Sequence, residues 1–195
     1  FQIKLAKIGG STFKKFIKID GTLKANSVLF GHVAKLIDEI ETGISKDSDY
    51  SSDSMEMGNE YEPQIEKDYT TPQQSKVGFA TNSKYKYAGV SPDMVFKDEF
   101  DIYFKANEIK TSEGPSLILW QMVDKIPSEH LPQIFMYFLI FEDIKSLKFI
   151  ARAPYNSKRK DFTKTVTREQ IATQLTNAHE SLLAIDKLIE KHLVK

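Results

Sequence analysis

Hydrophobic residues recur at the spacing of an amphipathic helix in two long stretches of the chain. The first runs from about residue 25 to residue 41 and stops at Thr42-Gly43, a normal helix end. The second follows Thr167 and Gln170, whose spacing predicts a capping box. Their apolar faces consist of Val28, Leu29, Val33, Leu36, Ile37 and Ile40 in the first, and Ile171, Leu175, Ala178, Leu182, Ile185, Ile189 and Leu193 in the second.

The remaining pattern mixes shorter helices with strands. Further helices are predicted over residues 11–17, 55–69 and 129–143. Strands are predicted over residues 77–80, 85–88, 146–151 and 162–167. Pro132 falls in the first turn of the third helix, where proline is tolerated. A short segment with Trp120, Met122 and Val123 is expected to pack against the body.

A polar turn at residues 97–101 separates two groups of strand-forming residues, Val95-Phe96 and residues 102–104. A hairpin bent at this turn places Asp93 opposite Glu108 on one face, since opposed residues of antiparallel strands share a face. Alternation along the second strand then puts Lys110 on that same face and sends Ile109 into the core. The hairpin therefore brings two carboxylates and one ammonium group together.

Opposed carboxylates destabilise a sheet unless a cation lies between them. Hard oxygen ligands of this number suit Mg²⁺ or Mn²⁺, held by a few carboxylates together with water and substrate phosphate. The alternative reading is that Asp93, Glu108 and Lys110 are solvated charges on a surface hairpin.

Composition narrows the classes of function. The chain has 195 residues with 27 basic and 27 acidic side chains, and this balance argues against broad nonspecific coating of nucleic acid, though not against a local basic channel. The absence of cysteine excludes disulfides, zinc–cysteine sites and iron–sulfur clusters. No apolar run reaches the length of about 18 residues that is needed to span a bilayer.

Four other places could carry chemistry. Gly9-Gly10-Ser11 precedes a short helix and offers backbone N–H groups and a hydroxyl to a phosphate, or Ser11 is simply the helix cap. Glu60 and Glu62 cannot both face the same way on a helix, and Gly58 before them indicates a close approach between backbones or to DNA. Gln133 either caps its apolar helix or faces the site.

The fourth place is a basic loop formed by Lys158, Arg159 and Lys160. It is either a solvated turn or a contact to a phosphate backbone, and the sequence favours neither reading.

Taken together and in this order, the motifs resemble those of the lambda exonuclease family, also called YqaJ-type viral recombinases, within the PD-(D/E)XK nucleases. The resemblance covers most of the chain from about Ile8 onward. It rests on the segments IGGSTFKKFI, MGNEYEP, VSPDMV, NEIK and HLPQIFMYF. Within MGNEYEP the family's Gly-x-x-x-Glu spacing assigns the functional glutamate to Glu62.

The resemblance implies an α/β fold with a restriction-endonuclease-like core, a mixed central β-sheet flanked by helices, forming one nuclease domain over residues 1–195. It implies that Asp93 and Glu108 bind Mg²⁺, with Mn²⁺ as a substitute and the Ile109 carbonyl as a further ligand. Glu62 would bind a second metal or a metal-bound water. Lys110 would orient and help deprotonate the attacking water or steady the phosphate charge.

Gln133 would help hold the nucleophilic water or Lys110, and Ser11 with Lys4 would contact the 5′-phosphate of a DNA end. The implied reaction is 5′→3′ digestion of one strand of linear duplex DNA, leaving a 3′ overhang for a single-strand annealing protein. The family also implies a trimeric ring and a cytoplasmic location, that of the host if the protein is phage-encoded.

Two other functions stay open at this point. One is a structure-specific or restriction-type endonuclease on the same fold, and the other is a non-catalytic DNA-binding protein. An RNA substrate is not excluded either, because nothing in the sequence visibly reads a 2′-hydroxyl.

Overall fold

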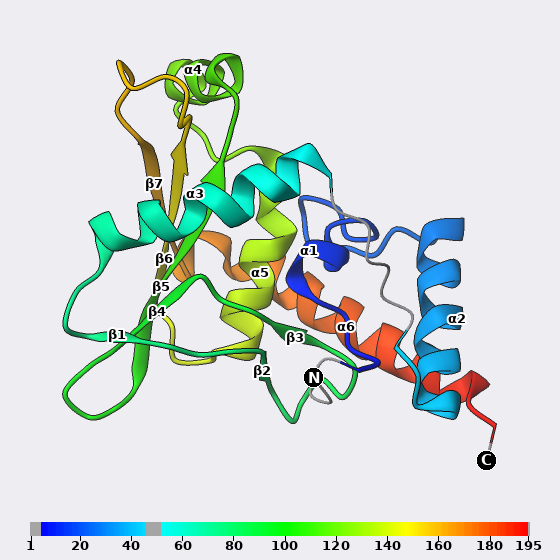
Figure 1. Cartoon of the computed structure of the whole chain (residues 1–195). Helices are drawn as coiled ribbons and strands as arrows, with labels where there is room; N and C mark the ends of the chain where they lie inside the picture. The colour runs from blue at the N-terminus through cyan, green and yellow to red at the C-terminus, as the bar shows by residue number, and fades with distance from the viewer. Residues whose placement is uncertain (1–4, 46–51, 195) are drawn as a thin grey trace.

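The computed structural model describes residues 5–45 and 52–194 and is built around a five-stranded mixed sheet (Figure 1). The strand order is β1-β4-β5-β6-β7, in which only β5 and β6 run parallel. The strands are β1 (Gln74–Ser75), β4 (Met94–Lys97), β5 (Tyr103–Thr111), β6 (Ser146–Arg152) and β7 (Phe162–Thr167). A separate two-stranded sheet pairs β2 (Ala80–Thr81) with β3 (Gly89–Val90). The fold class expected from the resemblance, a mixed sheet flanked by helices, is confirmed.

The predicted hairpin forms between β4 and β5 in the predicted register. Met94 pairs with Asn107 and Val95 with Ala106, and one step beyond this ladder Asp93 comes opposite Glu108. The turn between the strands is fixed by the Asp98 side chain, which accepts hydrogen bonds from the backbone N–H groups of residues 100 and 102. The chemistry of this turn therefore sets the register that places the two carboxylates.

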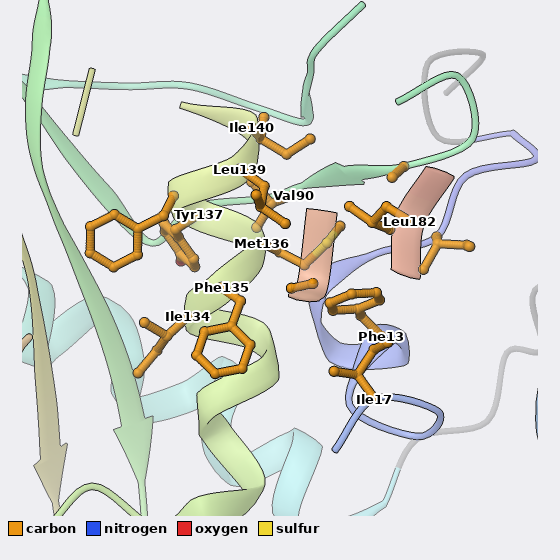
Figure 2. Packing of buried hydrophobic residues seen from close by; sticks show 14 of the residues in the cluster. Phe13, Ile17, Val90, Ile134, Phe135, Met136, Tyr137, Leu139, Ile140 and Leu182 are labelled. Carbon is orange, nitrogen blue, oxygen red and sulfur yellow. The ribbon is translucent and has the colours of Figure 1, made fainter. Parts of the chain in front are cut away.

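Helices cover both faces of the sheet. α3 (Asp53–Tyr69) crosses one face and packs through Ile65 on a small cluster of strand residues, which are Met94, Phe96, Ile109 and Ile150. α5 (Leu131–Ile140), entered through the 3₁₀ turn Ser128–His130, and α6 (Ala172–His192) pack with the main core on the other side. Figure 2 shows Met136 of α5 reaching toward Phe13 and Leu182, while Ile134 projects to the opposite side.

α5 is buried from Pro132 to Ile140, as its apolar sequence predicts. Carbonyl groups at the end of the helix and just beyond it are satisfied by Arg168, whose guanidinium donates to those of Phe138, Phe141 and Ile144. The helix is thus fixed at the centre of the molecule, with its side chains pointing both at the sheet and at the N-terminal region.

The amphipathic helices form close to their predicted bounds. α2 (Ser27–Thr42) is capped by the Asn26 side chain, and Gly43 follows in the left-handed conformation. The Thr167–Gln170 capping box forms ahead of the 3₁₀ turn Glu169–Ile171 that leads into α6. The assignment of Val28 to the apolar face of α2 is wrong, because that side chain is exposed.

Other predictions from the sequence are wrong. Residues 77–80 and 85–88 do not form a strand pair, because the backbone N–H groups of Lys86 and Tyr87 donate to the Asp186 carboxylate of α6 instead of to a strand. The segment near Trp120 is α4 (Gly114–Val123), whose outer side chains Met122 and Val123 are exposed rather than packed.

The first helix is also shorter than predicted. α1 spans only Gly10–Phe13, and the following residues form turns. Within the described ranges, no helix combines the length and the apolar character that crossing a membrane requires.

Candidate active site

Glu108 lies at the centre of the site, on the face of β5 that packs against α5. Its side chain is fully buried, yet both carboxylate oxygens are engaged. The Tyr137 hydroxyl donates to Oε2 at 2.5 Å, and the Lys110 ammonium lies 2.5 Å from Oε1. A buried carboxylate is tolerated here because a cation and a hydroxyl replace its lost hydration.

Asp93 lies beside this pair, just ahead of β4. Its Oδ2 accepts a hydrogen bond from the backbone N–H of Ile109 at 2.7 Å, and its own backbone N–H donates to the Tyr137 hydroxyl at 3.1 Å. Tyr137 therefore links the start of β4 to Glu108 on β5. The side chain of Ile109 points the other way and is buried in the cluster under α3, as predicted.

The charged groups in this cluster shift one another's pKa values. Burial raises the pKa of Asp93 well above its usual value, and the negative charge of Glu108 raises it further. Burial on its own would lower the pKa of Lys110, but the charges of Glu108 and Asp93 outweigh it, and the net pKa is raised. Burial and the same two carboxylates raise the pKa of Tyr137. At neutral pH Lys110 is therefore a cation and Tyr137 keeps its proton.

Glu62 reaches the site from α3. Burial raises the pKa of its carboxyl group, the charge of Lys110 opposes that rise, and the backbone N–H of Thr111 donates to it. A methyl group added at Gly58 would lie 3.4 Å from Glu62 Oε1, an ordinary contact distance, and the nearest atoms all belong to the Glu62 side chain rather than to another backbone. Glu60 is exposed, which agrees with the expectation that only one of the two acids faces the site.

A pocket of about 220 Å³ opens where these elements meet. Glu62, Asp93 and Ile109 line it, together with residues of α3 that include Gly58. Glu108 and Lys110 are not among the described residues that line it, and the Glu108 side chain is fully buried. The structure thus brings Asp93, Glu108, Lys110 and Glu62 to one place, at the end of β5 where the sheet meets α3.

The donor atoms fit a hard divalent cation in their chemistry. In the ranges that the structure describes, no three carboxylate or imidazole side chains are grouped as ligands of a single ion. Two carboxylates and a backbone carbonyl would leave positions for water and phosphate oxygens, as Mg²⁺ commonly requires. The raised pKa of Asp93 marks negative charge that such a cation would neutralise.

Gln133 lies next to Gly10, the residue that precedes Ser11. Gln133 is buried, and a methyl group added at Gly10 would lie 3.1 Å from its Cγ. Gln133 and Tyr137 are four residues apart on α5, so they share a helix face about one turn apart. The start of α1 therefore approaches the carboxylate cluster through Gln133.

Ser11 is exposed at the second position of α1. The residue preceding the helix is Gly9, and no side chain caps it, so the reading of Ser11 as the helix cap is wrong. Its hydroxyl is available to solvent. Lys4, which was paired with Ser11 in the sequence-based hypothesis, lies outside the described residues.

The basic loop lies at the margin of the site. Lys158, Arg159 and Lys160 are all exposed in the connection between β6 and β7. In the same loop Tyr155 contacts Tyr61 of α3 edge to face, with ring centroids 5.6 Å apart, and Tyr61 directly precedes Glu62. The loop is therefore close to the site, although its cations contact none of the predicted ligands in any recorded hydrogen bond or ion pair of the described residues.

Tyr137 is the functional residue that the sequence interpretation missed. The available signal was its position four residues after Gln133 in an otherwise apolar helix. A buried tyrosine hydroxyl needs a hydrogen-bond partner, and on this face the partner is the carboxylate cluster.

The chain is similar to known proteins in both sequence and structure. Residues 1–142 match the model of the YqaJ-like viral recombinase domain, whereas no curated protein matches the chain. The structure resembles an alkaline exonuclease, LHK-Exo from Laribacter hongkongensis, in complex with dAMP. That likeness has a TM-score of 0.73 at 20% identity and covers 98% of this chain and 93% of that one.

A phage-related exonuclease from Haemophilus somnus 129PT is a second solved neighbour. It aligns with a TM-score of 0.53 at 15% identity, covering 95% of this chain and 96% of that one. At these identities the likeness establishes a shared fold. Because the family match spans well over half of the residues, the chain belongs to the YqaJ-like viral recombinase domain family.

Proposed function

We propose that the protein is a metal-dependent DNA exonuclease that degrades one strand of linear duplex DNA in the 5′→3′ direction and leaves 3′ overhangs. The observation that carries this proposal is the convergence of Asp93, Glu108 and Lys110, with Glu62 entering the same pocket from α3. Membership of a recombinase family and a fold shared with exonucleases support it.

Asp93, Glu108 and the Ile109 carbonyl would hold Mg²⁺, with Mn²⁺ as a substitute, and Glu62 would bind a second metal or a metal-bound water. When bound, the metal would lower the pKa of a water molecule and stabilise the oxygens of an in-line displacement at phosphorus. These acidic residues provide the negative charge that attracts the cation to the pocket.

The other side chains of the site position the metal ligands and balance charge. Tyr137 and the Ile109 N–H hold Glu108 and Asp93 in place. Lys110 would orient and help deprotonate the attacking water, or steady the negative charge that develops on the phosphate. Gln133 would orient water at the entrance from α1.

The preference for 5′ ends is assigned to the start of α1. The exposed Ser11 hydroxyl would contact a terminal 5′-phosphate, and Gly10 beside it lies next to Gln133. Lys4 belongs to the same hypothesis. A homo-oligomer, trimeric by family resemblance, and a single-strand annealing partner complete the proposal.

Digestion of linear duplex DNA with Mg²⁺ tests the proposal, with 5′-phosphorylated, 5′-hydroxyl and closed circular substrates compared. We expect loss of the 5′-phosphorylated strand and release of mononucleotides, with the circle intact. A Ser11→Ala variant should lose the preference for the phosphorylated end. Cutting of the circle would favour the endonuclease, and no cutting with Mg²⁺ or Mn²⁺ would favour a DNA-binding protein.

A further inference from the structure

A groove with a basic rim lies between the segment that joins α1 to α2 and the start of α5. Its volume is about 640 Å³. Four lysines line it, whereas a single carboxylate, that of Glu129, faces them. The lining consists of Lys14, Lys15, Lys18, Lys24, Ile17, Ile19, Ser128, Glu129 and Pro132.

The positive charge of this groove is not neutralised locally. Among the described residues none of its four lysines forms a recorded ion pair, whereas Lys84, Lys86 and Lys164 elsewhere each pair with a carboxylate. Hydrogen bonds from Thr22 lower the pKa of the exposed Asp20, and Lys18 contributes only a smaller Coulombic effect. In a chain of zero net charge, four cations facing one wall form a distinct basic patch.

The groove adjoins the candidate active site. Pro132 lines it, and the next residue, Gln133, contacts the start of α1. His130 belongs to the 3₁₀ turn that leads into α5: burial lowers its pKa to about 4, and the charges of Lys110 and Lys14 lower it further. The catalytic ammonium and the groove therefore both lie within electrostatic range of one ring.

We propose that this groove binds the phosphate backbone of the DNA whose end occupies the active site, an inference that rests on the proposed nuclease function. Lysine is a point-charge donor to phosphate, and its contacts carry no base sequence information. The apolar floor formed by Ile17, Ile19 and Pro132 suits the sugar edge of a strand better than a free anion. The groove therefore holds DNA in position without selecting its sequence.

The salt dependence of binding tests the inference, because each lysine–phosphate contact lowers log K by about 0.7–0.9 per tenfold increase in salt. Binding of end-labelled duplex DNA is measured by fluorescence anisotropy over a salt series without divalent ions, which prevents cutting. The test variant replaces Lys14, Lys15, Lys18 and Lys24 by Gln. The control replaces the exposed Lys76, Lys145, Lys187 and Lys191 by Gln, which removes the same charge away from the groove.

We expect the salt slope of the groove variant to fall by about 2–4 relative to wild type, with affinity reduced at least tenfold at low salt. The control variant should keep most of the slope. Equal losses in both variants would mean that only net charge matters and would overturn the inference, as would an unchanged slope in the groove variant. Should the fourfold variant not fold by circular dichroism, the pairs Lys14/Lys15 and Lys18/Lys24 should each give about half the effect.

The outcome is separable from that of the nuclease proposal. If DNA binding depends on the groove lysines but no cutting occurs with Mg²⁺ or Mn²⁺, the groove proposal stands and the nuclease proposal fails. If the protein cuts DNA but its binding does not depend on the groove lysines, the nuclease proposal stands and the groove proposal fails.

Discussion

Replacing Tyr137 by phenylalanine removes one oxygen atom and two hydrogen bonds from the centre of the site. The ring would still fill its place in α5. Glu108 would lose its neutral donor, and the backbone N–H of Asp93 would lose its acceptor. A hydrogen bond to a charged group contributes about 1.5–3 kcal/mol, and a buried unpaired donor adds a penalty of similar size. Because part of that penalty overlaps, we expect the free energy of unfolding to fall by about 2–4 kcal/mol.

Thermal and urea unfolding followed by circular dichroism measure this loss. For a chain of this size it corresponds to a fall in Tm of roughly 5–15 °C. Tyr85→Phe is the matched control, because the Tyr85 hydroxyl also bonds to a side chain, that of His179, at 2.7 Å but outside the site. The free energy of unfolding of this control should fall by only about 0.5–1.5 kcal/mol, and the variant should keep its activity.

Activity separates a positioning role from a purely structural one. At temperatures where both variants are folded, Tyr137→Phe should lower kcat at least tenfold and raise the Mg²⁺ concentration needed for half-maximal rate, since Glu108 is no longer held. If Tyr137→Phe were as stable and as active as Tyr85→Phe, the assignment of Tyr137 as the link between the two carboxylates would be refuted.

Three further substitutions test the site. Asp93→Asn should abolish cutting yet raise metal-free stability at neutral pH by about 0.5–2 kcal/mol. The reason is that a folded-state pKa above the unfolded value of about 3.9 makes the ionised carboxyl unfavourable, so the gain should vanish as pH falls toward 4 in urea titrations. Lys110→Ala should abolish cutting and leave DNA binding nearly normal. It should lower the free energy of unfolding by about 3 kcal/mol, because Glu108 loses its ion-pair partner. Retained cutting would show that Lys110 takes no part in the chemistry. Gly58→Ala should stabilise α3 by about 0.5–1 kcal/mol and leave the cutting rate unchanged, because its methyl group would lie 3.4 Å from Glu62 Oε1, an ordinary contact distance. A rate lowered severalfold would contradict this placement of Glu62.

The sequence was most informative where local chemistry decides structure. The turn at Asp98 and the alternation of strand residues were enough to place Asp93 opposite Glu108, and the structure has that register. The apolar stripe of α6 and the Thr167–Gln170 capping box were readable for the same reason. Each of these features depends on residues that are close in sequence.

Features that depend on partners far away in the sequence could not be predicted from the sequence. Tyr85 and Tyr87 looked like strand residues, but Asp186, about a hundred positions away, takes the backbone N–H groups in that turn. Tyr137 looked like one more core aromatic because its partners lie on β4 and β5. The length of α1 was also overestimated, since its continuation is replaced by turns.

The two halves of the site are anchored in cores of different size. α5 and the α5-facing side of β5 belong to the main core, whereas α3 packs through Ile65 on a small cluster and is anchored at its end by polar contacts of Asp68 and Tyr69. Amide hydrogens of α5 should therefore exchange with solvent only on global unfolding. Those of α3 should exchange through a local opening that requires less free energy. On this view the Glu62 carboxylate can leave and rejoin the buried Asp93–Glu108 pair while the sheet stays folded, which gives a bulky polymer a way into a pocket that is narrow when closed.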